Sequence, residues 1–468
     1  MNPVAGFLCV LLLVIAGCAS GPSDATQPRF RESRSPEPPT TYPSPPNTPD
    51  GPLEPAVSAA LDTLVTSLLT GDIDEGALET MAASKDARLG WFVSDLLRFI
   101  QGSEHQDAVV GAFESLTGVD PRVDPAFAAS PWRSVTDDLI AWDLPAPPGY
   151  RELKARIFVE VEPGWELFFV DADAAIDWRL LSWGGVLIDD RPLGDTEPCE
   201  RGCIPALDDP VLTTAAEGDW YPDDRVVFGL VIGTDEVALP RNIMEVHEMV
   251  NMTIGGRRLG IPYCTLCGSA QAYYTDSVPA GIAVPVLRTS GLLVRSNKVM
   301  YDLETGSVLD TFTGQALSGP LQDAGLVLEQ ATVVVTTWGE WRAAHPATRI
   351  VAQDGGVGRV YPADPLRGRD DNGPIFPIGD VDPRLPVQAN IVGVIGPDGT
   401  PVAFPVEQAR ATLAEGREVV FGDIEVLSDG GGLRARLRGG AELPAHQAFW
   451  FAWSQFHPET VVWTPLIR

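Results

Sequence analysis

Residues 249–268 read MVNMTIGGRRLGIPYCTLCG. Two mainly apolar runs flank the pair Gly255-Gly256, and glycine accepts the positive backbone φ angles that a two-residue hairpin turn requires. The second run ends in Cys264 and Cys267, which are separated by two residues. The stretch therefore predicts a β-hairpin whose second strand leads into a pair of thiols.

Strand signals of the same kind occur from residue 149 to the end of the sequence. Short runs of β-branched and aromatic residues, bounded by Gly, Pro and Asp, predict strands over residues 226–232, 331–335 and 391–395. Helical spacing of apolar residues is rarer in this part and is clearest over residues 337–344 and 406–413. We expect residues 149–468 to form a mainly antiparallel, β-rich domain with a few helices.

Residues 56–148 instead place apolar side chains at helical spacing, in stripes that need neighbours to cover them. Ser130-Pro131 predicts the cap and first turn of one of these helices. The predicted fold class is therefore α+β, with a helical module ahead of the β-rich domain. The module holds no recognisable catalytic group of residues, so we interpret it as a packing or docking module for a protein partner.

The N-terminal residues resemble an export signal. Residues 4–16 are apolar but shorter than the roughly 20 residues of a membrane-spanning helix, and Ile15-Ala16-Gly17-Cys18 resembles a bacterial lipobox, although no Lys or Arg precedes the run. We predict a lipoprotein signal peptide over residues 1–17, lipidation of Cys18, and a disordered Pro-rich tether over residues 18–55. An ordinary secretory signal or a retained N-terminal anchor is the alternative. The expected location is the cell envelope, on the extracytoplasmic side of the membrane.

Composition narrows the classes of partner. The chain has 33 Lys and Arg against 64 Asp and Glu, a net charge of −31, which argues against binding to nucleic acid phosphates. It also lacks the G-x-S-x-G, H-E-x-x-H and phosphate-loop motifs, so no hydrolase or nucleotide-binding function is indicated.

Four cysteines remain for the folded part once Cys9 and Cys18 are set aside, in the patterns Cys199-x3-Cys203 and Cys264-x2-Cys267. Thiols outside the cytoplasm tend to be oxidised, so two disulfides are the default, with three pairings open by count alone. We interpret Cys199 and Cys203 as a local structural disulfide. The C-x2-C spacing also suits a redox-active dithiol, which makes Cys264 and Cys267 candidate catalytic residues.

The same two sulfurs would need further ligands to hold a metal. The predicted hairpin brings the segment before its first strand near Cys264, so His247 is a candidate third ligand. Cys, His and Met together suit copper(I), and Cys with His suits zinc, for which all four cysteines are a further alternative. Met249 and Met252 are explained equally well as core residues.

An ordered series of short motifs extends from about residue 195 to 463: Ile204 to Pro210, Pro240 to Ile243, His247-Glu248 with Asn251, Tyr263 to Ser269, Ser290 to Leu293, Val299 to Asp302, Thr305 to Ser307, Thr337-Trp338 and His345-Pro346. This series resembles the bacterial domain-of-unknown-function 3179 family. The resemblance implies an exported or envelope-associated protein with a Cys-x2-Cys core motif and no settled activity.

The chain departs from that family pattern at three positions. Thr265 stands where Pro is usual between the cysteines, Met252 where an acidic residue is usual, and Leu309 where Trp is common. Both cysteines, His247, Tyr301 and Asp302 are retained, so the resemblance implies a site centred on these residues.

Two hypotheses of different class follow. The first is a lipid-anchored envelope protein whose Cys264 and Cys267 form a redox-responsive or metal-holding centre supported by His247. The second is a non-enzymatic binding or scaffold lipoprotein in which both cysteine pairs are purely structural.

Overall fold

The computed structural model describes residues 41–465, except 125–126, 129 and 369–372. The predicted signal peptide, the lipidation of Cys18 and most of the predicted tether lie outside these residues. The described chain divides into two compact units, one covering Thr41–Phe169 and one beginning at Val170. No helix in the described ranges is both long and apolar enough to span a membrane.

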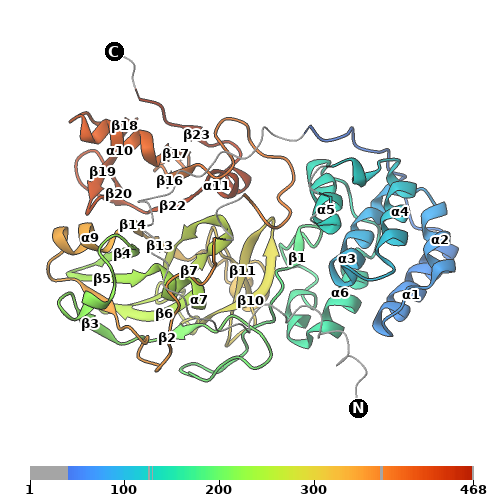
Figure 1. Ribbon diagram of the computed structural model, residues 1–468, viewed down its shortest axis with the longest axis horizontal. Helices are drawn as coiled ribbons and strands as arrows, with labels where there is room; N and C mark the ends of the chain where they lie inside the picture. Colours follow the sequence, from blue (N-terminus) through green and yellow to red (C-terminus); the bar gives the residue numbers. More distant parts are fainter. Residues whose placement is uncertain (1–40, 125–126, 129, 369–372, 466–468) are drawn as a thin grey trace, which may run out of the picture. The chain divides into compact units, whose positions relative to one another are not determined.

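The first unit is helical, as predicted (Figure 1). Its α-helices are α1 (Pro55–Leu69), α2 (Glu75–Ala83), α3 (Gly90–Ile100), α4 (Gln106–Thr117), α5 (Pro131–Ala141) and α6 (Tyr150–Val161), with 3-10 turns η2 (Ala87–Leu89), η3 (Pro121–Val123) and η4 (Pro163–Phe168). The predicted cap of α5 is confirmed, because the Ser130 side chain accepts a hydrogen bond from the backbone N–H of Arg133.

Two expected boundaries of this unit were wrong. The β-rich part does not begin at residue 149, because α6 follows directly and Ile157 and Phe158 on it are buried. The predicted tether was expected to continue to residue 55, but its last residues bond to the helical unit. Trp142 Nε1 donates to Pro43 O at 2.7 Å, and the Arg88 guanidinium donates to Gly51 O at 3.0 Å. Residues 41–54 thus form part of the helical unit.

The second unit holds five small sheets among its described residues. The first sheet has the strand order β1 (Leu181–Trp183), β10 (Leu287–Val294), β11 (Asn297–Asp302) and β12 (Val308–Asp310), and the second has the order β13 (Glu329–Ala331), β9 (Ala272–Tyr274), β7 (Arg257–Cys264), β6 (Met249–Ile254) and β2 (Leu207–Asp208), with β8 (Ser269–Ala270) beside β7. The third sheet has the order β14 (Val334–Thr337), β4 (Val226–Ile232), β5 (Asp235–Pro240), β15 (Arg349–Val351) and β3 (Leu212–Thr214). The fourth has the order β22 (Ala445–Phe449), β16 (Asn390–Ile395), β17 (Pro401–Pro405) and β23 (Val461–Val462), and the fifth has the order β18 (Val419–Phe421), β19 (Ile424–Asp429), β20 (Gly432–Leu437) and β21 (Glu442–Leu443).

Most of the strand pairs are antiparallel, which confirms the prediction; the parallel ones are β2 with β6, β5 with β15, and β17 with β23. The predicted strand over residues 331–335 is split between β13 and β14. The helices of this unit are α7 (Arg241–His247), α8 (Gly319–Asp323), α9 (Trp338–Ala344), α10 (Val406–Ala414) and α11 (Trp450–Phe456), and short 3-10 turns η5 (Glu217–Trp220) and η6 (Thr265–Cys267) complete it. The helices α9 and α10 confirm the two helical patterns.

The hairpin predicted around Gly255-Gly256 is formed by β6 and β7, with Ile254 paired to Arg257. Both glycines have positive φ angles, of 57° and 74°. A Cβ at Gly255 would also lie 2.2 Å from the backbone oxygen of Ile232, so the turn has no room for a side chain there. The hairpin fixes where β7 begins, and Cys264 lies at the other end of that strand.

One arrangement of strands and a helix occurs twice in this unit. In the first copy β14, β4, β5 and β15 form a sheet and α9 joins the outer strands; in the second copy β22, β16, β17 and β23 do the same with α11. Both helices carry the pattern W-x2-W-x3-H-P-x-T, beginning at Trp338 and at Trp450. In each copy the second Trp donates to the Thr hydroxyl at 2.9 Å, from Trp341 to Thr348 and from Trp453 to Thr460.

A turn from a neighbouring sheet packs against each copy. The turn between β19 and β20 lies on the first copy, where a Cβ at Gly432 would come within 2.4 Å of the Val334 side chain. The turn between β7 and β8 lies on the second copy, where a Cβ at Gly268 would come within 3.0 Å of the Phe449 ring. The thiol pair therefore lies where the turn between β7 and β8 packs against the second copy.

Candidate functional site

The two cysteines lie in a tight turn at the end of β7. Cys264 is the last residue of β7, Cys267 the last of the 3-10 turn η6, and Gly268 with a φ of 57° closes the turn. The two Sγ atoms are 3.0 Å apart, and both lie near the backbone oxygen of Ser296, at 3.9 Å from Cys264 and 3.5 Å from Cys267. The sulfurs thus face each other at hydrogen-bonding distance without a covalent bond.

The pair is almost completely buried, with 1% of Cys264 and none of Cys267 exposed. Apolar residues pack around it, most of them from the second copy: Phe312, Ile378, Ile391, Trp450, Phe451 and Trp453. A folded protein could not reach either sulfur in this conformation.

The environments of the two thiols differ. Burial raises the pKa of Cys264, but the hydrogen bond from the Cys267 thiol, the backbone N–H of Lys298 and the Lys298 ammonium outweigh it, so that the pKa is lowered. Burial and the neighbouring Cys264 thiolate raise the pKa of Cys267 well above its ordinary value. The pKa shifts of the two buried thiols therefore have opposite directions.

A buried ion pair lies beside the turn. Lys298 on β11 donates from Nζ to the backbone oxygen of Glu248 at 2.5 Å, and the same Nζ is 3.5 Å from Glu248 Oε2. Thr265, between the two cysteines, donates to Glu248 Oε1 at 3.0 Å. Burial lowers the pKa of Lys298, while Glu248 and the thiols act against that shift.

Glu248 has an unusual backbone conformation. It ends α7 with a φ of 51°, in the left-handed region that residues other than glycine seldom adopt. Its backbone oxygen accepts from the N–H of Tyr263 as well as from Lys298. The strain is compensated by these bonds, which fix the carboxylate next to the turn.

A cavity of about 200 Å³ borders this group of residues. Glu248, Lys298 and Thr265 contribute polar groups to its wall, together with Glu245, Thr289 and Ser290. The rest of the wall is mainly apolar: Val186, Ile204, Leu266, Leu292, Leu293, Val299, Leu366, Ile375 and Phe376. Neither cysteine lines the cavity, although Thr265 and Leu266 between them do.

His247 does not turn its ring nitrogens to the sulfurs, contrary to the hypothesis that it is the third ligand of a metal ion. Its Nδ1 donates to Pro205 O at 2.7 Å, and its Nε2 accepts from the Tyr361 hydroxyl at 2.7 Å, so both ring nitrogens are occupied. Burial lowers the pKa of His247 to about 4, which keeps the ring neutral.

The described residues also give no geometric support to a copper or zinc site. No three His, Cys, Asp or Glu side chains in the described part of the chain are grouped so that they could hold a metal ion. Met249 and Met252 belong to two hydrophobic clusters of the core. Copper or zinc held by Cys264, Cys267 and His247 therefore has no support in the structure.

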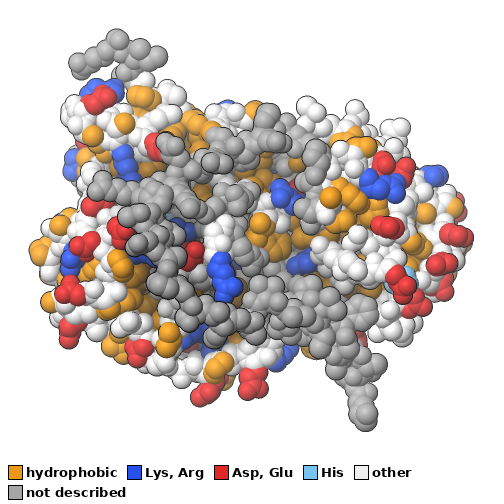
Figure 2. Space-filling model, viewed as in Figure 1, with side chains coloured by type: hydrophobic (Ala, Val, Ile, Leu, Met, Phe, Trp, Pro, Cys, Tyr) orange, Lys and Arg blue, Asp and Glu red, His pale blue; other side chains and the backbone are white. Residues whose placement is uncertain are grey.

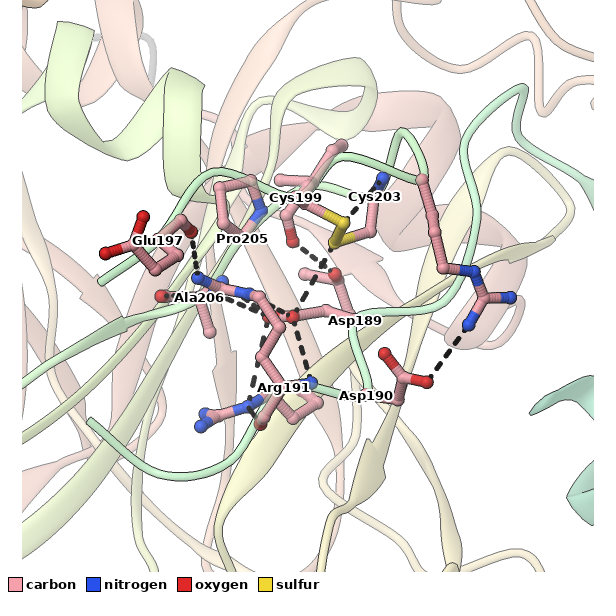
Figure 3. Close-up of a disulfide and its surroundings, with 12 residues drawn as sticks. Asp189, Asp190, Arg191, Glu197, Cys199, Cys203, Pro205 and Ala206 are labelled. Atoms are coloured by element: carbon pink, nitrogen blue, oxygen red, sulfur yellow. Dashed lines mark hydrogen bonds and ion pairs between the residues drawn. A yellow bond between two sulfur atoms is a disulfide. The ribbon is translucent and has the colours of Figure 1, made fainter. Parts of the chain in front are cut away.

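The other cysteine pair forms the predicted disulfide, Cys199–Cys203 (Figure 3). This bond excludes zinc held by all four cysteines. Next to it the buried Asp189 carboxylate accepts from Arg191 Nε at 2.6 Å and from the backbone N–H of Ala206 at 2.7 Å, as Figure 3 shows. The disulfide thus holds the segment whose Pro205 carbonyl receives the bond from His247.

The remaining motif residues serve the fold around the site. The Tyr301 hydroxyl donates to Asp189 O at 2.7 Å. Asp302 accepts from the backbone N–H groups of Val286 and Thr305, at 2.8 and 3.0 Å, and so closes a turn. The predicted common centre thus separates into a thiol turn and a distinct supporting network.

Sequence reasoning missed Lys298 and Glu248. One signal was available, because Lys298 is one of only three lysines among the 33 basic residues of the chain. A lysine within a strand is unusual in a chain whose basic residues are nearly all arginine, so it indicates a position with specific contacts. Its partner Glu248 carries no comparable signal, because acidic residues are abundant here.

Comparisons with known proteins give one match. A family model described as "Protein of unknown function (DUF3179)" matches residues 201–436, just over half of the chain, including the thiol turn, Glu248 and Lys298. No curated protein and no solved structure matches the chain.

Proposed function

The chain belongs to the DUF3179 family of proteins of unknown function, and we propose that its Cys264 and Cys267 form a dithiol that is reversibly oxidised to a disulfide. The observation that carries this proposal is the Sγ–Sγ distance of 3.0 Å in a turn where one thiol has a lowered pKa and the other a raised one. A small rotation of the side chains would close the bond. Such asymmetry is typical of redox-active C-x2-C pairs.

We also propose that the protein acts at the cell envelope as a lipoprotein held by Cys18. The Cys199–Cys203 disulfide supports this address, because disulfides persist mainly in oxidising compartments. A dithiol in the same compartment requires a reductant to return it from the oxidised form, so its oxidation state would follow local redox conditions.

The second candidate is a non-enzymatic binding or scaffold lipoprotein. The observation that favours it is the burial of both sulfurs among aromatic and aliphatic residues, where a structural disulfide would be sealed. The helical unit would then be the docking surface for a protein partner. In the face shown in Figure 2, acidic side chains are scattered among other types, and no single charged patch marks such a partner.

The experiment that separates the candidates is a redox titration of the full chain. After equilibration in buffers of increasing thiol to disulfide ratio, free thiols are alkylated and mapped by mass spectrometry. We expect Cys264 and Cys267 to change together between disulfide and dithiol, while Cys199 and Cys203 stay bonded. A pair that remains entirely reduced or entirely oxidised across the series contradicts the redox proposal and supports the scaffold.

A further inference from the structure

We propose that the cavity beside the thiol turn binds a small, neutral carboxamide, which is a primary amide on an apolar hydrocarbon group. Neither cysteine lines this cavity, so the inference stands whether or not Cys264 and Cys267 change their oxidation state. The volume of about 200 Å³ has room for a molecule of roughly ten non-hydrogen atoms. The wall is built from α7, the thiol turn, β10 and β11, so elements from different sheets enclose it.

The hydroxyl groups of the wall already donate their hydrogens within the protein. Thr265 donates to Glu248 Oε1 at 3.0 Å, while Thr289 and Ser290 each donate to a backbone oxygen, at 2.7 and 2.6 Å. A hydroxyl oxygen whose hydrogen is used can still accept a hydrogen bond. Among the described side chains of the wall, Lys298 is therefore the one that still has hydrogens for a ligand, and the other polar groups are acceptors.

Lys298 and Glu248 leave hydrogen-bonding capacity open at the cavity. Lys298 Nζ donates to Glu248 O at 2.5 Å, but it is 3.5 Å from Glu248 Oε2, which accepts no hydrogen bond from any described residue. Both side chains are largely buried, with exposures of 6% and 14%. Buried polar groups are normally hydrogen-bonded, so the pair favours a ligand with an acceptor for Nζ and, next to it, a donor for Oε2. The carbonyl oxygen and the N–H group of a primary amide are arranged in this way.

The charges of the wall favour a neutral ligand. Lys298 lies beside the Glu248 carboxylate, and Glu245 Oε1 is paired with Arg241 Nε at 2.6 Å. Each carboxylate of the wall thus has a cation next to it, and a ligand with a net charge would be buried without a counter-charge of its own. The other side chains of the wall are mainly apolar, which suits a hydrocarbon group.

The first test compares three probes that share one aromatic ring and differ in charge: benzamide, benzoate and benzylamine. Ligand-observed NMR measures the dissociation constant of each probe for the full chain at neutral pH. We expect benzamide to bind at least about tenfold more tightly than either charged probe, because it meets both polar atoms without burying a net charge. Equal affinities for the three probes, or no detectable binding of benzamide, would overturn the inference.

Two variants of the ion pair test the selection by charge. Glu248→Gln removes the carboxylate but keeps the backbone oxygen that holds Lys298, so the wall gains a positive charge and benzoate should become the tightest probe. Lys298→Met leaves the Glu248 carboxylate unpaired, so benzylamine should become the tightest. Thermal melts establish which variants are folded, and Glu248→Gln decides the question alone if Lys298→Met does not fold. An unchanged order of the probes in Glu248→Gln would contradict the inference.

A third variant tests the location of the site. Leu266 lines the cavity, so the larger side chain of Leu266→Trp should abolish binding of benzamide to the folded protein. Leu193→Trp, at an exposed position outside the cavity, is the matched control and should bind benzamide as the wild type does. Binding that survives Leu266→Trp, or that is lost equally in both variants, would place the ligand elsewhere and overturn the inference.

Discussion

At the scale of single residues, His247 supports the fold and is not part of the thiol pair's chemistry. Its two ring nitrogens hold Pro205 and Tyr361, which belong to segments far apart in the sequence. It therefore joins parts of the fold and makes no contact with the sulfurs.

The first prediction concerns the substitution His247→Phe. The aromatic ring keeps the volume but leaves the Pro205 carbonyl and the Tyr361 hydroxyl without partners, so we expect the free energy of unfolding to fall by about 1–3 kcal/mol. Denaturant titration measures the loss, and Tyr361→Phe, which removes one bond only, should cost less. The thiolate titration of Cys264 and Cys267 should be unchanged; a shifted titration curve would mean that His247 acts on the thiols.

The second prediction concerns Asp138 on α5. Burial, followed by the nearby Asp124 and Asp137, raises its pKa to about 7. Because the folded pKa is above the unfolded value of about 4, the folded state prefers the protonated acid, and stability is lost as the pH rises from about 4 through 7.

We therefore expect Asp138→Asn to match the wild type near pH 4 and to be more stable at pH 8, by about 1 kcal/mol or more. Thermal melts at the two pH values measure this difference. Asp107→Asn, at an exposed position of α4, is the matched control and should show no such pH dependence. Equal melting temperatures of Asp138→Asn and wild type at pH 8 would show that the carboxylate is stable in its charged form.

At the scale of elements, the hairpin of β6 and β7 was predictable from the sequence, but the contacts of the His247 side chain were not. The Gly255-Gly256 pair is a local signal, and the turn it predicts is the turn observed. His247, however, belongs to α7, a seven-residue helix whose pattern is too short to be recognised. Because β6 begins only at Met249, opposite Pro262, His247 belongs to the helix, and its ring bonds to Pro205 and Tyr361 instead of the thiols.

The disulfide provides the third prediction. Cys199–Cys203 closes a loop of five residues, for which the chain-entropy estimate is about 2 kcal/mol. The double variant Cys199→Ser, Cys203→Ser should lose roughly that much stability in denaturant titration, because residues 199–203 become freer in the unfolded chain. Its Cys264–Cys267 redox titration should be unaltered. A changed midpoint for that pair would mean that the two cysteine pairs are coupled.

At the scale of the whole molecule, the division into a helical unit and a β-rich unit was readable from hydrophobic spacing alone. The doubled arrangement was not recognised, although the pattern W-x2-W-x3-H-P-x-T at Trp338 and Trp450 was visible. The ion pair of Lys298 with Glu248 could not be predicted either, because it joins β11 to the end of α7 across fifty residues. Local patterns identify elements, whereas contacts of that kind depend on how the sheets pack.

The fourth prediction concerns the location of the protein in the cell. If Cys18 carries the lipid, the variant Cys18→Ser should appear in the soluble fraction after cell lysis, whereas the wild type sediments with membranes and incorporates a labelled fatty acid. The Cys199→Ser, Cys203→Ser variant serves as the control and should remain with the membranes. Membrane retention of Cys18→Ser, without label, would indicate a retained N-terminal anchor instead of a lipoprotein.

The doubled arrangement separates support from variation. Each copy has an indole N–H that donates to a threonine hydroxyl, but the turns packed against the copies differ. The turn against the second copy carries Cys264 and Cys267, whereas the turn against the first has Asp429-Gly430-Gly431-Gly432. The repeated framework is therefore shared by both halves, and the residues that distinguish them are carried by neighbouring sheets.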